Sequence, residues 1–380
     1  MAQRVKTDWL LFFTVVAMVC FGLIVVYSAS SVVAEVRYQE SSYFFLIRQI
    51  GAAIVSLAVM MFVKSRDYRM FRSPAWAFVG LGVVLMMLVA VYFADPRAHR
   101  WFRIGPMKLQ PSEFAKPALI IFLAYFVALR ARVINNRYTL MPAALAVVLL
   151  ACMVVVADLG TAIVLVATAA AIFYVAGMER RYFIVAILGG MAFAMIAVVS
   201  KPYRLNRIIQ FFDPEYKVLS YLDPGGTIKR YTSSSLATRD TGYQGLQSRI
   251  AVGNGGVLGV GLMQGKQKML FLPEAHTDSI YAVVGEELGF LGCTALLAGF
   301  LVILYRGIWL SIHAPDDFGR YLALGVTASI VVQALVNITV VLDLVPTKGI
   351  PLPMISYGGS SLLSTLMSLG LLMSVSERTG

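Results

Sequence analysis

Four acidic residues and one histidine gather in residues 272–287 and give this stretch the clearest potential for chemistry. Asp278 stands where a long polar segment ends and an apolar run begins. Partial desolvation at such a junction raises the pKa of a carboxyl, although a helix N-terminus lowers it, and a carboxylate tuned in this way can act as a general base. Glu274 and His276 are close enough in sequence to assist. The stretch therefore predicts acid–base chemistry centred on Asp278.

Glu286 and Glu287 lie further along the same apolar run. At about 1.5 Å per residue of helix they are roughly 12 to 14 Å from Asp278, too far to form a carboxylate pair with it. We therefore expect them to serve a cavity or another helix. His276 also has a plainer alternative, because a lone histidine near a membrane surface is more often a hydrogen-bonded structural residue than a reactive one.

A second charged group precedes this stretch in the chain. Arg100 and Arg103 flank an aromatic pair and can bind an anion such as a pyrophosphate. The alternative is that these arginines only meet anionic lipid head groups. Glu113 and Lys116 are three residues apart, so they share a helical face and can pair. A lysine within an apolar run is costly and is a functional candidate, but a structural ion pair with Glu113 explains it equally well.

Further polar positions interrupt the apolar runs near their ends. Asp158 separates two strongly apolar runs, where it either caps the helix that follows or binds a substrate or cation. Ser356 and Ser360 follow a proline-rich stretch and either pack against neighbouring helices or line a polar cavity. Lys348, within that stretch, is a candidate supporting residue, as are the two adjacent glutamates described above.

These residues need a membrane scaffold to position them. The chain is 59% hydrophobic and 14% charged, well outside the usual range of a soluble domain. A span takes about 20 apolar residues, and the runs lack the alternation of a β-barrel. We therefore expect an all-α polytopic membrane protein with about ten transmembrane helices. The predicted spans are residues 9–28, 44–63, 74–93, 114–129, 140–157, 160–178, 182–200, 278–305, 320–342 and 353–375.

The positions of lysine and arginine in the short loops predict the orientation. With the N-terminus in the cytoplasm, both termini lie inside, while Asp278 and the segment 201–277 lie outside. The net charge of +12 is then largely the positive-inside excess and needs no nucleic-acid partner. The three cysteines are far apart within predicted spans, so neither a disulfide nor a metal site is predicted from them.

The outer loop, residues 201–277, is too long for a simple connection and is expected to be functional. Residues 201–212 alternate basic and apolar side chains, as an amphipathic helix on the outer leaflet would. The candidate substrate-binding residues on that helix are Tyr203, Arg204 and Arg207. Residues 218–241 are rich in Ser, Thr, Gly and Asp and are expected to be flexible, whereas the glycines of 242–265 indicate tight backbone packing.

Several ordered motifs together resemble those of the SEDS family of cell shape, elongation, division and sporulation proteins. The motifs are Gln-Pro-Ser-Glu with Lys116, Asp-Leu-Gly-Thr from residue 158, Pro-Glu-Ala-His-Thr-Asp from 273, Gly-Glu-Glu-Leu-Gly from 285 and Ile-Ser-Tyr-Gly-Gly-Ser-Ser from 355. They cover nearly the whole chain. Ala275 and the stretch 346–353 resemble the division branch, FtsW, more than the elongation branch, RodA.

The resemblance implies a ten-helix peptidoglycan glycosyltransferase in the bacterial cytoplasmic membrane. Such an enzyme polymerises lipid II, releases undecaprenyl pyrophosphate and acts with a class B penicillin-binding protein and other division or elongation proteins. The family's catalytic aspartate corresponds to Asp278. Arg100, Arg103 and Lys116 would offset the charge that develops on the pyrophosphate. No cofactor is required by the motifs, and a divalent cation, Mg²⁺ or Mn²⁺, is the one candidate.

Two other classes of function use the same residues differently. A lipid II flippase would need a continuous polar route between the leaflets. A scaffold without catalysis would need only packed helices, and the cluster of costly charges around one outer site argues against it. Two departures from the family pattern affect local geometry: 218–241 resembles an insertion, and Ala157 and Ser279 replace the usual Pro and Phe.

Overall fold

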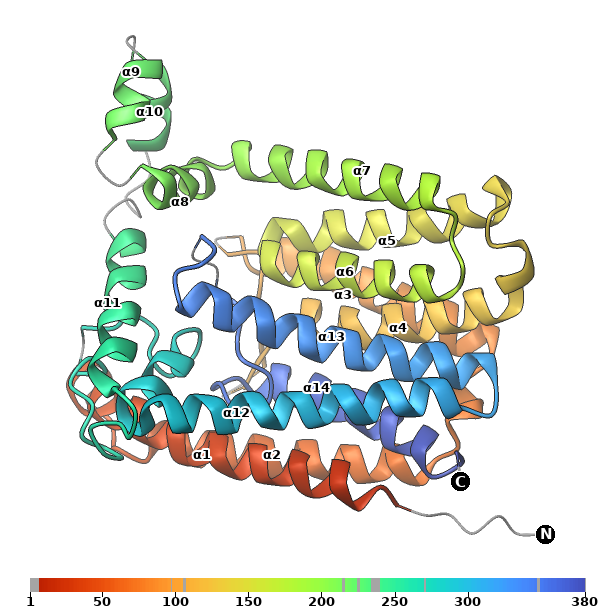
Figure 1. The fold of residues 1–380 in the computed structure, drawn as a ribbon, viewed down its shortest axis with the longest axis horizontal. Coiled ribbons are helices and arrows are strands. Elements are labelled where there is room, and N and C mark those ends of the chain that lie inside the picture. Colours follow the sequence, from red (N-terminus) through yellow and green to blue (C-terminus); the bar gives the residue numbers. More distant parts are fainter. Residues whose placement is uncertain are drawn as a thin grey trace.

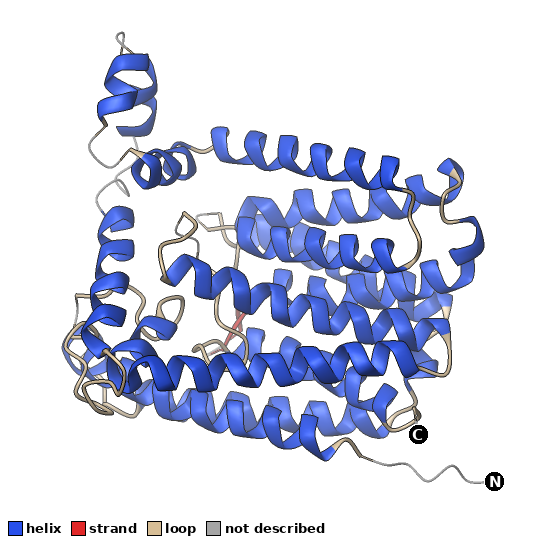
Figure 2. Cartoon of the chain, viewed as in Figure 1, coloured by secondary structure: helices blue, strands red, loops and turns tan. Residues whose placement is uncertain are grey.

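Long parallel and antiparallel helices form one bundle, and the segment between α7 and α12 covers one end of it (Figure 1). The computed structural model describes residues 7–96, 98–104, 107–213, 216–223, 226–233, 240–269, 271–346 and 349–379. Apolar runs of this length form helices because lipid cannot satisfy open backbone groups. Figure 2 shows helices joined by loops, and one short hairpin is the only sheet among the described residues.

The bundle is built from ten helices that correspond to the ten predicted spans. They are α1 (Trp9–Tyr38), α2 (Phe44–Ser65), α3 (Gly80–Ala94), α4 (Pro111–Arg130), α5 (Arg137–Ala157), α6 (Leu159–Val175), α7 (Arg180–Val199), α12 (Ile280–His313), α13 (Asp317–Val341) and α14 (Gly359–Ser376). Within the described residues, nine helices are long and apolar enough to cross a membrane, and α6 is shorter. The predicted all-α polytopic class is therefore confirmed.

Shorter elements connect these helices. They are η1 (Tyr68–Phe71), η2 (Ala75–Val79), β1 (Phe102–Ile104), β2 (Met107–Leu109), η3 (Ala131–Val133), α8 (Pro202–Phe212), α9 (Lys217–Leu222), α10 (Thr227–Ser233) and α11 (Asp240–Gly255). The strands β1 and β2 pair antiparallel, with Arg103 opposite Lys108. This hairpin was not predicted. It brings the chain from the end of α3 to the start of α4.

The helices differ sharply in how deeply they are buried. In the most apolar window of α14, 83% of the residues are buried inside the protein, against 11% for α7. Six serines on α14 allow close approach of its neighbours, as small residues do in membrane bundles. In contrast, α7 runs along one edge of the bundle beside α5 and α6 (Figure 1). Its inner face is therefore available to line a cavity.

Residues 218–241, predicted to be flexible, contain two short helices, α9 and α10, in the part that the structure describes. An aspartate four residues before the first residue of each helix accepts hydrogen bonds from its first turn. Asp213 accepts hydrogen bonds from the backbone N–H groups of Lys217 and Leu219, at 2.8 Å each. Asp223 accepts them from Thr227 and Ile228, at 2.9 and 2.7 Å. Such caps satisfy the unpaired donors of a first helical turn.

Candidate active site

A cavity of about 610 Å³ opens at the loop-covered end of the bundle and brings six of the predicted site residues together. They are Arg100, Asp158, Tyr203, Arg204, Arg207 and Asp278. The opposite wall is apolar and comes from α7. Its lining residues are Met191, Ala194, Met195 and Val198. A charged end joined to an apolar wall suits a ligand with an anionic head and a hydrocarbon tail.

Asp278 lies two residues before α12, and its half-buried carboxylate faces the cavity. No described residue forms a hydrogen bond with this carboxylate. Burial raises the pKa of Asp278 to about 7, the nearby Arg100 lowers it, and the negative charge of Glu274 raises it. Gly349 packs against the carboxylate, since a Cβ there would lie 2.6 Å from Oδ2. Any side chain at position 349 would displace the carboxylate.

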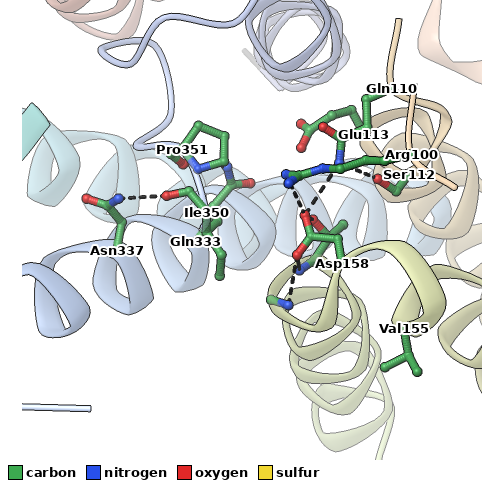
Figure 3. Close-up of polar contacts among 12 residues, drawn as sticks. Arg100, Gln110, Ser112, Glu113, Val155, Asp158, Gln333, Asn337, Ile350 and Pro351 are labelled. Atoms are coloured by element: carbon green, nitrogen blue, oxygen red, sulfur yellow. Dashed lines mark hydrogen bonds and ion pairs between the residues drawn. The ribbon is translucent and has the colours of Figure 1, made fainter. Parts of the chain in front are cut away.

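The backbone around Asp278 is held at three successive carbonyl groups, those of residues 276–278. The donors, in order, are the N–H of Tyr357 at 2.9 Å, Oγ of Ser356 at 2.5 Å and Nδ2 of Asn337 at 2.9 Å. Asn337 also donates to the carbonyl of Ile350, at 2.7 Å (Figure 3). One buried amide therefore joins the Asp278 segment to the segment that carries Gly349. We call the three hydrogen bonds to the carbonyl groups of residues 276–278 the carbonyl clamp.

We expect Asn337→Ala to lower kcat for the site's reaction by roughly 10- to 100-fold with little change in KM, because a shift of about 1 Å in a reacting group has effects of that size. Two carbonyls lose their donor, whereas the cavity walls stay in place. Steady-state kinetics would measure both constants. Thr339→Val is the matched control, because Thr339 donates only within its own helix. If the Asn337→Ala protein kept the wild-type kcat, Asn337 would not be a positioning residue.

Asp158 caps α6, as one of its two predicted roles requires. Its Oδ1 accepts from the N–H groups of Gly160 and Thr161, at 2.9 and 3.2 Å. Its Oδ2 accepts from the Arg100 guanidinium at 3.3 Å and from Gln110 at 3.4 Å (Figure 3). Arg100 Nε is buried and has no hydrogen-bond partner among the described residues. Asp158 thus holds Arg100 at the cavity.

The two arginines of α8 have different surroundings. Arg204 is buried and donates to the carbonyls of Val155 and Ala197, at 2.7 and 3.1 Å. Its guanidinium therefore ties α8 to the ends of α5 and α7. Arg207 lines the cavity, where burial lowers its pKa and the negative charge of Asp278 raises it. Of the two, Arg207 is the one whose charge is directed to Asp278. The predicted helix over 201–212 is confirmed.

Glu113 and Lys116 form the predicted ion pair, with 2.8 Å between Oε2 and Nζ, and both side chains are buried. Lys116 also donates to Oε1 of Gln333 at 2.6 Å, and Gln333 donates to the carbonyl of Pro351 at 2.8 Å. The pair does not line the cavity. The contacts of the pair hold the segment 349–353 in place. They support the alternative in which Glu113 and Lys116 form a structural ion pair.

Several other predicted site residues lie outside the cavity lining. Arg103 is exposed on the β1–β2 hairpin, and Glu274 is exposed in the loop before Asp278. His276 is buried against the rings of Phe45 and Tyr357, at centroid distances of 4.8 and 5.7 Å, and burial lowers its pKa. The ring therefore packs as a structural residue would, but it is not the hydrogen-bonded one expected, because its buried Nδ1 has no partner among the described residues.

The remaining predicted residues support the fold around the site. Ser356 belongs to the carbonyl clamp, and Ser360 is buried at the start of α14. Glu286 and Glu287 are buried and contact the loop after α11 and helix α1. That arrangement matches the expectation that they serve another helix. Lys348 lies outside the described residues.

Sequence reasoning did not assign a role to Asn337, Gln333, Gln110 or Gly349. A signal existed for the first two, because they are polar residues four positions apart on one face of an apolar run. No comparable pattern distinguishes Gly349 among the 31 glycines. Its importance comes from its contact with a side chain 71 positions away, at residue 278.

The described residues contain no group of three or more His, Cys, Asp or Glu side chains that could hold a metal ion. Asp158 uses its oxygens for protein donors. The donor set therefore does not fit a metal held by the protein alone. A divalent cation carried by an anionic substrate stays a proposal.

One protein-family model matches nearly the whole chain. The model of the cell cycle protein family FtsW/RodA/SpoVE matches residues 8–380. The chain belongs to this family. The resemblance predicted from the sequence motifs is therefore confirmed.

Two relatives of this FtsW/RodA/SpoVE member match nearly the whole chain, and the name of the first indicates an activity. The "Probable peptidoglycan glycosyltransferase FtsW" of Geobacter metallireducens is 39% identical, with 98% of this chain and 95% of the relative covered. "Stage V sporulation protein E" of Bacillus subtilis is 36% identical over 99% of this chain and 98% of that protein.

Solved structures show the same fold. A chain from a peptidoglycan synthase complex, described as coordinating polymerization and crosslinking, has a TM-score of 0.76 and 26% identity, with 98% of both chains covered. The rod shape determining protein RodA of Thermus thermophilus has a TM-score of 0.66 and 24% identity, covering 98% of this chain and 97% of RodA. At 24% identity, the likeness to RodA shows the fold alone.

Proposed function

We propose that this protein is a peptidoglycan glycosyltransferase that polymerises lipid II on the outer face of the bacterial cytoplasmic membrane, in cell division or elongation. One observation carries the proposal: the carboxylate of Asp278, which accepts no hydrogen bond from a described residue, faces a cavity that also holds three arginines and an apolar wall. A carboxylate with a pKa of about 7 is suited to accept a proton at neutral pH. The name of the Geobacter metallireducens relative, a probable peptidoglycan glycosyltransferase, supports the same activity.

In the proposed reaction, Asp278 removes the proton from the acceptor sugar hydroxyl as its oxygen attacks the anomeric carbon of the donor. A new glycosidic bond forms, and the bond from the anomeric carbon to the pyrophosphate oxygen breaks. Undecaprenyl pyrophosphate leaves with the electron pair. Arg100 and Arg207 offset the negative charge that develops on this leaving group. The apolar α7 wall offers a surface for its hydrocarbon chain.

The proposal includes a sidedness and a partner. Both the start of α1 and the end of α14 lie at the bundle end opposite the cavity (Figure 1). Together with the positive-inside pattern, this arrangement supports a topology with both termini in the cytoplasm and the cavity outside. A class B penicillin-binding protein supplies the crosslinking reaction, in keeping with the polymerization and crosslinking complex to which the chain is similar.

The test is polymerisation of labelled lipid II by purified protein in detergent, with and without a matched class B penicillin-binding protein. Glycan strands on a gel support the proposal. If no strands form with a matched partner, while lipid II crosses a liposome bilayer that contains the protein, the flippase alternative replaces it. Absence of both activities leaves the scaffold alternative.

The pH dependence of polymerisation follows from the pKa of Asp278, which burial raises to about 7. The base acts when deprotonated, so kcat/KM should rise about tenfold per pH unit below pH 7 and level off above about pH 8. Because Arg100 lowers this pKa, Arg100→Gln should move the midpoint to higher pH. The exposed Lys108→Gln serves as the control for a lost outer charge. A flat profile, or a midpoint that moves down in Arg100→Gln, would contradict the assignment.

A further inference from the structure

The loop after α11 exposes a cluster of apolar side chains. The exposed fractions are 64% for Val257, 76% for Leu258, 40% for Val260 and 45% for Leu262. We call residues 256–263 the apolar loop. Its polar neighbours on either side, Asn254 and Lys266, are also exposed. An apolar tip between polar flanks is the composition of a segment that enters a membrane from one side.

The apolar loop is continuous with the lipid-facing surface of α12. Gly289 interrupts that helix with φ 63° and ψ −157°. The next two residues of α12 donate from their backbone N–H groups to the loop, Phe290 to the carbonyl of Gly256 at 2.9 Å and Leu291 to that of Val257 at 3.2 Å. Phe290 and Leu291 are 66% and 54% exposed on a helix of membrane-spanning length. The apolar loop and this lipid-facing surface therefore lie side by side.

Three backbone donors of the apolar loop, those of residues 259–261, are paired within the protein. The N–H groups of residues 259, 260 and 261 bond to the carbonyls of Gly255, Glu286 and Glu287, at 2.7, 3.0 and 3.0 Å. Irregular backbone is tolerated at membrane depth only where the protein satisfies it, because hydrocarbon offers no partners. A loop in water needs no such pairing, since water would bond to its N–H groups.

The two adjacent glutamates extend this pairing with their side chains. Glu287 accepts from the N–H of Met263 at 3.2 Å, and Glu286 accepts from the N–H of Lys266 at 2.8 Å. Glu287 is itself neutralised by buried Lys268 at 2.5 Å and bonded by Ser28 of α1. The Glu287 charge is thus paired, and both carboxylates are buried beneath the loop.

We propose that residues 256–263 form a lipid-inserted loop, whose apolar tip lies among acyl chains of the leaflet on the Asp278 side. The occupant of this surface is lipid hydrocarbon. The loop leads directly into the segment that carries Asp278, so the insertion sets the height of that segment relative to the bilayer. The proposal concerns the membrane contact and is independent of the glycosyltransferase activity.

The test is a fluorescent label at position 258. Leu258→Cys is made in a protein whose Cys20, Cys152 and Cys293 are replaced by alanine, and it is labelled with an environment-sensitive dye in lipid nanodiscs. Leu301→Cys on lipid-facing α12 and Tyr221→Cys on α9 are the matched controls, because their side chains are 53% and 86% exposed. Val257→Cys repeats the measurement at the neighbouring position.

We expect the labels at 257 and 258 to emit at shorter wavelength than the label at 221. Lipids brominated on their acyl chains should quench them at least about twofold, as for the label at 301, while aqueous iodide quenches them weakly. Iodide quenching equal to that at position 221 would overturn the proposal. Protection from both quenchers would also overturn it, because a protein partner would then cover the loop.

Discussion

The Asp278→Asn protein should polymerise lipid II at least about 100-fold more slowly than the wild type, the lower limit of what a positioned general base contributes. Asparagine keeps the shape of the side chain and the carbonyl clamp on its backbone, but its amide cannot accept the proton. Asp278→Ala should lose as much. Glycan strand formation at saturating lipid II, with the class B partner present, measures the effect.

The carboxylate also has to be in the right place, so Asp278→Glu should recover only part of the activity. One added methylene would drive the carboxylate toward Gly349, which already packs against it. The matched control is Asp343→Asn. This acid lies outside the cavity lining, it pairs with the exposed Arg249 at 3.3 Å, and its φ of 56° suits asparagine. If Asp278→Asn kept more than about one tenth of the wild-type rate, the base would have to be another group.

Replacing Glu287 with alanine should destabilise the protein by about 3–5 kcal/mol, the usual cost of leaving one member of a buried ion pair alone. Lys268 and Glu287 have side chains only 2% and 1% exposed, and their charged atoms are 2.5 Å apart. Removal of the carboxylate leaves the Lys268 ammonium buried and also takes an acceptor from Ser28 and Met263. Thermal unfolding in detergent, followed by tryptophan fluorescence, would register the loss.

A double variant separates charge from packing. Glu287→Gln with Lys268→Met removes both charges and should be more stable than Glu287→Ala, because no buried charge is left unpaired. The exposed pair Arg249 and Asp343 is the control, and its loss should cost less than about 1 kcal/mol. If the Glu287→Ala protein unfolds at the wild-type temperature, the ion pair of Lys268 and Glu287 contributes nothing to the stability of the protein.

The helical framework could be predicted from the sequence because it depends on local composition. Each apolar run contains a helix, although α1 ends ten residues and α12 eight residues beyond the predicted span. Asp158 could be assigned as a cap because a cap acts on the residues that follow it directly. The ion pair of Glu113 and Lys116 likewise depends only on helical spacing.

The contacts that tertiary packing creates could not be predicted in the same way. The charge pattern of α8 did not show that Arg204 would bond to backbone carbonyls of two other helices. The polar composition of residues 218–241 suggested flexibility, whereas Asp213 and Asp223 accept hydrogen bonds from the first turns of two short helices there. The β1–β2 hairpin is formed by three-residue strands, too short to give a periodic signal.

The carbonyl clamp has a consequence for how sequences of this family can diverge. It grips main-chain atoms of residues 276–278, which every amino acid supplies, so side chains at 276 and 277 can change without loss of these bonds. Two of the donors are the side chains of Ser356 and Asn337, 79 and 59 positions away from their acceptors. Evolutionary constraint from the geometry of Asp278 should therefore fall on distant residues as well as on its neighbours in the chain.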